Sequence, residues 1–334
     1  MAENTELLRV ENLATSFKTE RGIMKAVDGI TFQVKSNEIL GIVGESGCGK
    51  SVTVQSVMRL YDEKYLARIE GEVVFDGKDL LKLTERQMEK IRGYAISMVF
   101  QDALSALNPV MRIGEQIIEG ILLHHKEMSR QEAADKALDI LKQVGIPAYN
   151  ERFYQYPHEL SGGMRQRVMI AIALVCQPRI LIADEPTTAL DVTIQAQIMN
   201  LIVNLKEQYG MSVMLITHDL AVVAETCDRV IVMYLGQIVE EAEVKDLFLN
   251  PVHPYTKGMM ASIPAMSEDK PERLYVIKGT VPLLSQIPKG CRFAPRCEYA
   301  TKRCRSEMPE LTVIERGHKV RCFMEQRGND GTEK

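Results

Sequence analysis

Residues 44–51 read GESGCGKS, and this stretch decides which fold the chain can adopt. It follows an apolar run at residues 38–43 and satisfies the phosphate-loop pattern G-x-x-x-x-G-K-[ST]. Glycines let such a loop wrap around phosphates with its backbone N–H groups pointing inward. A chance glycine-rich turn would not require a preceding strand and a following helix, so we predict a nucleotide site. Its members are Gly44, Glu45, Ser46, Gly47, Cys48, Gly49, Lys50, Ser51 and Val52.

Individual side chains of this loop have distinct expected tasks. Lys50 should reach the β- and γ-phosphates of ATP, and the Ser51 hydroxyl should bind Mg²⁺. The helix that follows directs its positive N-terminal end at the same anion. Cys48 is interpreted as a small side chain that fills space, in preference to a catalytic thiol.

Working outward, further apolar runs end at polar residues. Residues 180–183 end at Asp184, and residues 213–217 end at His218. Strands buried on both faces have this continuous apolar pattern, and helical stretches lie between them. We therefore predict an α/β sheet with its chemistry at the carboxyl ends of the strands.

Asp184 and Glu185 are predicted to carry the hydrolysis. Asp184 is placed to hold Mg²⁺, and Glu185 to act as general base towards the attacking water. Two adjacent acids could equally be a solvated turn, but the phosphate loop earlier in the chain favours the catalytic interpretation.

Two further polar residues follow predicted strands. His218 is expected to contact the γ-phosphate and to orient the attacking water, although a lone histidine is more often structural. Gln101 ends the apolar run at residues 97–100 and could contact Mg²⁺ or that water. Without its context, Gln101 would be an ordinary surface residue.

The chain divides into regions of different pattern. Residues 7–34 with 70–77 indicate an antiparallel β subdomain, and residues 102–176 a helical insertion, in which 130–144 has helical spacing. Beyond residue 250 lie eight of the 13 prolines, so long regular elements are not expected there. We predict an ATPase domain at residues 1–249, with its helical subdomain at about 102–176, and a carboxyl-terminal extension at residues 250–334.

Two motifs then indicate a family. Residues 160–166 read LSGGMRQ and residues 183–191 read ADEPTTALD. With the phosphate loop and His218, they resemble the ABC ATPase family, whose core is a P-loop NTPase of RecA-like fold. Ser161 can cap the following helix, while Gly162 and Gly163 leave backbone N–H groups open to an anion.

The resemblance implies further roles. In that family two ATPase domains stack head to tail, so that each signature closes over the ATP of its partner. Phe17 becomes a candidate for stacking on adenine, and is equally well interpreted as a packed strand residue. The residues implied to face the partner's ATP are Ser161, Gly162, Gly163, Gln166 and Asp191.

Residues 250–256 (NPVHPYT) and 290–297 (GCRFAPRC) resemble the extension of dipeptide and oligopeptide importer ATPases. Nickel and other small-solute importers of that group share it. The resemblance implies an ATP-hydrolysing subunit at the cytoplasmic face of the membrane, bound peripherally. Its implied partners are a second ATPase subunit (a different chain is favoured), two transmembrane permease subunits and an extracytoplasmic peptide-binding protein.

Hydrophobic pattern and net charge are consistent with a peripheral ATPase subunit. No window offers the roughly 18 consecutive apolar residues that a membrane span requires, and the first residues lack the pattern of a secretory signal. A net charge of −4 gives no indication of a nucleic-acid partner. A soluble ABC ATPase acting on ribosomes or DNA is the rival hypothesis, but the chain lacks a second phosphate loop and sustained heptads.

Four of the seven cysteines cluster near the end, with the spacing C-x5-C-x6-C-x17-C. Four thiolates could hold zinc or an iron–sulfur cluster, and this spacing fits neither template closely. Resemblance to the importer group favours a structural [4Fe–4S] cluster over zinc, and zinc over no metal; a redox-sensing role is the alternative. Nearby cations would offset its charge: Arg292, Arg296, Lys302, Arg303 and Arg305. The predicted ligands are Cys291, Cys297, Cys304 and Cys322.

Overall fold

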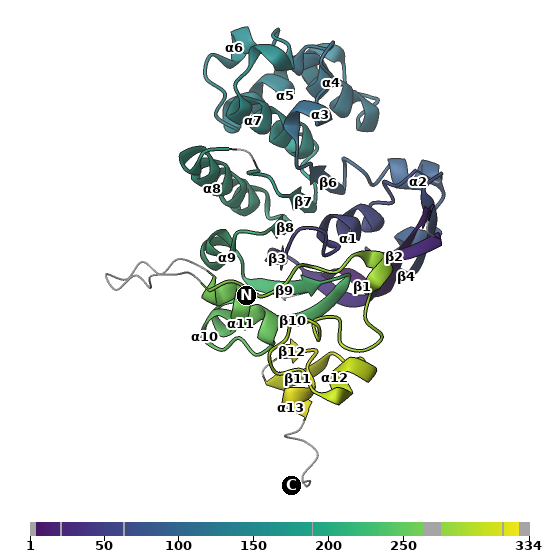
Figure 1. Cartoon of the computed structure of the whole chain (residues 1–334). Coiled ribbons are helices and arrows are strands. Elements are labelled where there is room, and N and C mark those ends of the chain that lie inside the picture. Colours follow the sequence, from purple (N-terminus) through teal and green to yellow (C-terminus); the bar gives the residue numbers. More distant parts are fainter. Residues whose placement is uncertain are drawn as a thin grey trace, which may run out of the picture. The chain divides into compact units, whose positions relative to one another are not determined.

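The computed structural model describes residues 5–20, 22–62, 64–188, 190–262, 275–315 and 317–326. The chain forms two compact units, each assembled from separate stretches of sequence (Figure 1). One, the helical unit, comprises Met1–Thr5, Val34–Ile39 and Lys82–Ile216. The other, the β-rich unit, comprises Glu6–Gln33, Leu40–Leu81 and Thr217–Lys334.

A parallel sheet lies in the helical unit. Its strands β6 (Ile96–Val99), β7 (Ile180–Asp184) and β8 (Ser212–Thr217) are ordered β8-β7-β6. Every residue of the three strands is buried, as their continuous apolar sequences predict. The predicted α/β architecture is confirmed, and the strand ends point to one edge of the sheet.

Helices α4, α5 and α7 pack against one another in the same unit, where Figure 1 draws them as a cluster with α3 and α6. Helix α5 begins after Ser129, whose side chain and that of Glu132 form a capping box. It buries Ala133, Ala137 and Leu141, which share one face at helical spacing. The helices of this unit are α2 (Glu85–Glu89), α3 (Ala103–Ala106), α4 (Ile113–His124), α5 (Arg130–Gln143), α6 (Tyr149–Arg152), α7 (Gly162–Leu174) and α8 (Val192–Tyr209), with a 3₁₀ turn at Pro157–Glu159.

The β-rich unit contains an antiparallel sheet of order β2-β1-β4-β5. Strand β1 (Glu6–Thr19) pairs with β4 (Leu66–Phe75), with Leu8 opposite Phe75. Strand β1 buries Leu8, Val10 and Leu13, and β4 buries Val73 and Phe75 near its end. The remaining strands are β2 (Gly22–Lys35) and β5 (Lys78–Asp79), and a 3₁₀ turn follows at Leu80–Lys82.

A second set of strands in the β-rich unit carries the phosphate loop. Strand β3 (Ile39–Val43) is parallel to β9 (Arg229–Tyr234), and β10 (Gln237–Glu243) is antiparallel to β9. Strand β12 (His318–Val320) pairs with β10 and with β11 (Thr312–Glu315), so the end of the chain continues this sheet. The helices of this unit are α1 (Lys50–Val57), α9 (Leu220–Thr226), α10 (Val244–Leu249), α11 (Pro254–Ala261), α12 (Lys302–Ser306) and α13 (Phe323–Gln326), with a 3₁₀ turn at Leu284–Gln286.

The extension shares a hydrophobic core with the strands around the loop. Tyr255 and Phe293 lie in one buried cluster with Val43, Val232 and Tyr234. The domain limits at residues 249 and 250, and the helical subdomain at about 102–176, stay predictions. Within the described part of the chain, none of the helices has the length and apolar character needed to cross a membrane.

Candidate functional site

The phosphate loop lies between β3 and α1 and depends on its glycines. Gly44 has φ +152°, and a Cβ on it would lie 2.3 Å from the carbonyl oxygen of Met233. Gly47 and Gly49 have φ +77° and +101°, a region that residues with a Cβ rarely adopt. The backbone therefore takes a course around the loop that only this glycine pattern permits.

Lys50 begins α1 and folds back over the loop. Its Nζ donates hydrogen bonds to the carbonyl oxygens of Gly44 at 2.8 Å and Glu45 at 3.3 Å. Gly49 caps α1 without a side-chain hydrogen bond, and the first turn of the helix contains no acidic residue. Ser51 and Val52 lie half-buried in that turn. The glycine-rich loop, the Lys50 ammonium and the N-terminus of α1 together fit the phosphates of a nucleotide.

Cys48 lies inside the loop and is 1% exposed. Burial raises the pKa of its thiol, which is therefore neutral at pH 7. A Cβ on Gly44 would come within 2.7 Å of the Cys48 sulfur, so this side chain fills the space against the loop.

Glu185 and Gln101 meet at the ends of neighbouring strands in the helical unit. Gln101 follows β6 and donates from Nε2 to Glu185 Oε2 over 3.1 Å, and the Thr188 hydroxyl donates to the same oxygen over 3.0 Å. The Glu185 backbone has φ 45°, and its N–H donates to the Ile216 carbonyl at 2.9 Å. Asp184, the last residue of β7, is 3% exposed. A carboxylate held by two donors is well placed to orient a water molecule.

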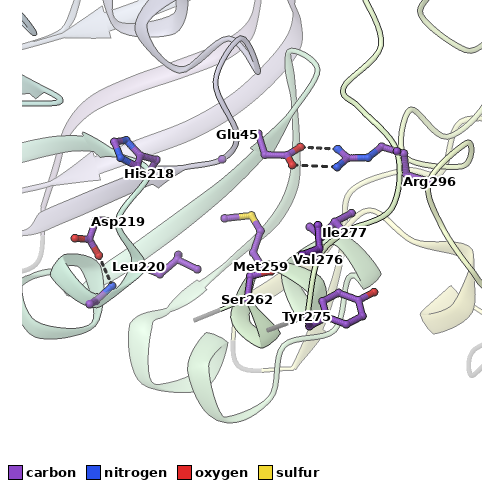
Figure 2. A pocket seen from close by; sticks show the side chains of 13 residues that line it. Glu45, His218, Asp219, Leu220, Met259, Ser262, Tyr275, Val276, Ile277 and Arg296 are labelled. Atoms are coloured by element: carbon purple, nitrogen blue, oxygen red, sulfur yellow. Dashed lines mark hydrogen bonds and ion pairs between the residues drawn. The ribbon is translucent and has the colours of Figure 1, made fainter. Parts of the chain in front are cut away.

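His218 lies beside the start of the phosphate loop. Within the β-rich unit, a cavity of about 780 Å³ is lined by His218, Gly44 and Glu45, with residues of the carboxyl-terminal extension opposite (Figure 2). Asp219 accepts hydrogen bonds from the N–H groups of Ala221 and Val222, and so begins α9 directly after the histidine. The histidine is thus presented at the junction of a strand and a capped helix.

Phe17 lies on β1 and is half-buried. Its ring meets Tyr61 edge-on, with centroids 4.8 Å apart. Both interpretations of Phe17 stay open, because such a pair is a packing contact that still leaves part of the Phe17 ring exposed.

The signature residues gather around one cavity of the helical unit. This cavity, of about 570 Å³, is lined by Ser161, Gly162, Gly163 and Asp191 among others. Ser161 caps α7 by accepting from the Met164 N–H at 3.4 Å, and Asp191 caps α8 by accepting from the Ile194 N–H at 3.0 Å. Two helix N-termini therefore open towards the same space, which suits an anion.

Gln166 lies one turn along α7 and is 4% exposed. Its Nε2 makes no hydrogen bond within the structure. A buried amide donor of this kind usually has a partner, so Gln166 has capacity to bind a further group.

Comparison with known proteins identifies the family. The family model for ABC transporters matches residues 27–188, and the model described as the carboxyl-terminal region of oligopeptide/dipeptide transporters matches residues 239–304. A probable peptide ABC transporter ATP-binding protein of Sinorhizobium fredii is 54% identical over 95% of this chain and 94% of its own length. This chain belongs to the ABC transporter ATP-binding family.

A second curated relative and a solved structure support the same family for this ABC ATPase. The oligopeptide transport ATP-binding protein AppD of Bacillus subtilis is 50% identical over 95% of this chain and 96% of its own length. A solved ATP-binding cassette, dimeric and bound to ADP and Pi after hydrolysis, aligns with a TM-score of 0.64 and 30% identity. That alignment covers 71% of this chain and 99% of the cassette, so the P-loop ATPase fold is confirmed.

The predicted iron–sulfur cluster is wrong, and so is the zinc alternative. Among the residues that the structure describes, no group of three or more His, Cys, Asp or Glu side chains is arranged to hold a metal ion. Without a bound metal, burial raises the pKa of Cys291 and Cys297, and that of Cys322 to about 11. The four predicted ligands, Cys291, Cys297, Cys304 and Cys322, border a small cavity of about 20 Å³. The other residues that line this cavity are largely apolar.

Three of the five nearby cations form ion pairs with carboxylates. Arg292 pairs with Asp28, Arg296 with Glu45, and Arg303 with Glu307. Lys302 and Arg305 are exposed. These charges therefore do not indicate a buried anionic cluster, and the cysteine spacing, which matched no template, was the better guide.

Sequence reasoning missed several residues that contact the site. Thr188 lies within the ADEPTTALD motif, where a hydroxyl three residues after Glu185 was a usable signal. Tyr255 and Arg296 contact Glu45 although they lie 210 and 251 residues further along the chain. No local sequence pattern predicts such pairs.

Proposed function

We propose that this ABC ATPase hydrolyses ATP to drive a membrane importer of dipeptides or oligopeptides. The observation that carries the proposal is the presence, in one chain, of a complete phosphate loop, a Gln101–Glu185 pair and a signature cavity, together with the peptide-transporter type of carboxyl-terminal region. The relatives of similar length are described as peptide, oligopeptide and dipeptide transport ATP-binding proteins.

The loop is assigned to nucleotide binding. Amides of residues 44–51 and the Lys50 ammonium bind the phosphates, and Phe17 contributes to the adenine site. Ser51, Asp184 and Gln101 would hold Mg²⁺. When bound, Mg·ATP supplies the phosphoryl group that water attacks and the cation that offsets its charge.

Glu185 is assigned to the hydrolytic water. As general base it takes a proton from this water, and Gln101 and Thr188 fix the carboxylate for that task. His218 orients the same water from the end of β8. Both roles depend on preorganised hydrogen bonds, which is how P-loop ATPases lower the barrier to phosphoryl transfer.

Membership of the ABC transporter family implies permease subunits as partners and a pair of ATPase domains. We assign Ser161, Gly162 and Gly163, with Gln166 and Asp191, to the nucleotide bound by the second ATPase domain. The finer assembly that we propose has a different chain as second ATPase, two permeases, and an extracytoplasmic binding protein that delivers the peptide. The chain would act peripherally at the cytoplasmic face of the membrane.

Reconstitution in proteoliposomes tests this function. This chain, its companion ATPase and the two permeases are purified together, and ATP hydrolysis is measured with the binding protein either empty or loaded with a mixture of dipeptides to pentapeptides. We expect loaded binding protein to stimulate hydrolysis and peptide to accumulate only with ATP. Stimulation by Ni²⁺-loaded binding protein, with none by peptide, would reassign the solute; no stimulation by either would refute the importer role.

A further inference from the structure

Glu45, in the phosphate loop, is held by a side chain of the carboxyl-terminal extension. Arg296 forms a two-pronged ion pair with it, Nη1 lying 2.5 Å from Oε2 and Nη2 lying 3.0 Å from Oε1 (Figure 2). Both residues belong to the β-rich unit. Fork-to-carboxylate pairs of this geometry fix orientation as well as supplying charge.

Arg296 is itself immobilised, which distinguishes this pair from an ordinary surface salt bridge. Its side chain is only 5% exposed, and its Nε donates to the carbonyl oxygen of Lys278 over 3.1 Å. The guanidinium carbon lies 5.8 Å from the ring centroid of Tyr234 and 6.0 Å from that of Phe293. The Glu45 carboxylate raises the pKa of Arg296, so the cation is permanent.

Tyr255 holds the backbone of the same residue. Its hydroxyl accepts a hydrogen bond from the Glu45 N–H over 2.8 Å, and its side chain is completely buried. His253 caps α11 by accepting from the Tyr255 N–H at 3.1 Å, and the Tyr255 ring packs on Tyr234 and Phe293. The NPVHPYT motif therefore positions the Tyr255 hydroxyl against the phosphate loop.

The held residue bears directly on the loop's cation. Lys50 donates to the carbonyl oxygens of Gly44 and Glu45, so a displacement of Glu45 would move two acceptors of the ammonium. An unneutralised carboxylate in the loop would also repel a polyphosphate. Arg296 removes that repulsion without contributing to the cradle itself.

We propose that Arg296 and Tyr255 are positioning residues of the ATP site, which hold Glu45 in the conformation that receives the phosphates and neutralise its charge. The inference rests on the proposed ATPase function and adds to it a dependence of nucleotide affinity on the extension. The extension would thus act on the motor's own phosphate loop.

Nucleotide affinity in four variants tests the inference. In the purified ATPase, we measure the Kd of a fluorescent ATP analogue and the kcat and KM of hydrolysis for R296Q, R296K, Y255F and the double variant E45Q/R296Q. We expect R296Q to raise Kd and KM about tenfold with kcat within about twofold of wild type, because phosphate binding is lost equally in ground and transition states. R296K should lie between, since lysine retains charge without the fork.

The double variant separates a positioning role from a general loss of stability. E45Q removes the carboxylate that R296Q leaves unpaired, so E45Q/R296Q should bind the analogue about threefold or more tightly than R296Q. A purely structural effect of the arginine would not be relieved by a change in the loop. R303Q is the matched control, because Arg303 forms an exposed ion pair with Glu307 in the same extension, and it should bind as wild type does.

Several results would overturn the inference. If wild type binds nucleotide and folded R296Q binds it within twofold of wild type, Arg296 has no positioning role, and the ATPase function stands. If R296Q does not fold, R296K and Y255F decide, and unchanged Kd in both refutes the inference. Failure of wild type to bind any nucleotide would instead refute the proposed function.

Discussion

The side-chain amide of Gln101 donates a hydrogen bond to the carboxylate of Glu185 over 3.1 Å, joining the ends of β6 and β7. These strands are parallel neighbours, with Val99 opposite Ala183, so both residues leave the sheet at the same edge. With the Thr188 hydroxyl on the same oxygen, the amide fixes the orientation of the Glu185 carboxylate. The pair links a loop at the edge of the helical unit to the residue assigned to hydrolysis.

Replacing Glu185 by Gln should stop hydrolysis and leave nucleotide binding intact. The amide is nearly isosteric but cannot accept a proton, so we expect kcat to fall by about 10²-fold or more. The Kd of the ATP analogue should stay within about twofold of wild type, because the loop that binds the phosphates is unchanged. Steady-state ATP hydrolysis at saturating ATP measures kcat. Turnover close to that of wild type would remove Glu185 from its assigned role.

Replacing Ser161 by Asp should block hydrolysis through the signature cavity. Aspartate is a preferred helix cap, so α7 should be retained and the free energy of unfolding should change by less than about 1 kcal/mol. The added charge would face the second ATPase domain's nucleotide, and we expect hydrolysis to fall about tenfold or more. Binding at this chain's own loop should not change. S129D, at the cap of α5, is the matched control, and equal loss in both variants would contradict the assignment.

Replacing Gly44 by Ala should disrupt the loop. The new Cβ would lie 2.3 Å from the Met233 carbonyl oxygen at φ +152°, so the backbone must move. We expect the free energy of unfolding to fall by about 2 kcal/mol or more, with loss of nucleotide binding. In Gly47, φ is +77° but a Cβ would meet no atom within 4 Å, so G47A should cost only about 1 kcal/mol. Urea unfolding of the two variants compares them, and equal stabilities would show that the clash is relieved.

His253 should make the protein less stable in mild acid. Burial, opposed by Glu240 and reinforced by Arg321, lowers the pKa of His253 from 6.5 to about 4, and the side chain is 1% exposed. Between pH 6.5 and 4 the unfolded state therefore binds a proton that the folded state does not, and stability rises with pH in this window. From pH 7 to pH 5 we expect a loss of about 2 kcal/mol from this group.

H253N tests that contribution. Asparagine can cap α11 in place of the imidazole but does not titrate, so the loss between pH 7 and pH 5 should shrink by most of that amount. Urea unfolding at both pH values measures it. Glu240 does not affect the comparison. Burial opposes its ionisation, but hydrogen bonds from the His318 ring and from the Val252 and His253 N–H groups lower its pKa below 4.5, so its stabilising effect is lost only at lower pH. An unchanged pH dependence in H253N would show that His253 is not the group responsible.

Much of the site could be predicted from local sequence because it is built from local structure. The loop at residues 44–51, the acids after β7 and the signature before α7 each consist of a strand or helix end and its adjoining residues. Patterns of buried strands and capped helices are short-range, so their spacing identifies both the element and the group it presents. The α/β class, and the family with its ATPase chemistry, followed from these segments.

The contacts of the carboxyl-terminal extension could not be predicted from the sequence in this way, because they join residues far apart along the chain. Arg296 meets Glu45 across 251 residues, and Tyr255 meets it across 210. A guanidinium or a hydroxyl has no periodicity that names its partner, so the cations near the cysteines were assigned to a metal cluster that the described residues do not form. The packing of Phe293 on Tyr255 and Tyr234, with Arg296 against the same rings, brings these groups to Glu45. Burial then decides the protonation of the thiols and of His253, since the cost of a charge depends on the solvent that folding removes.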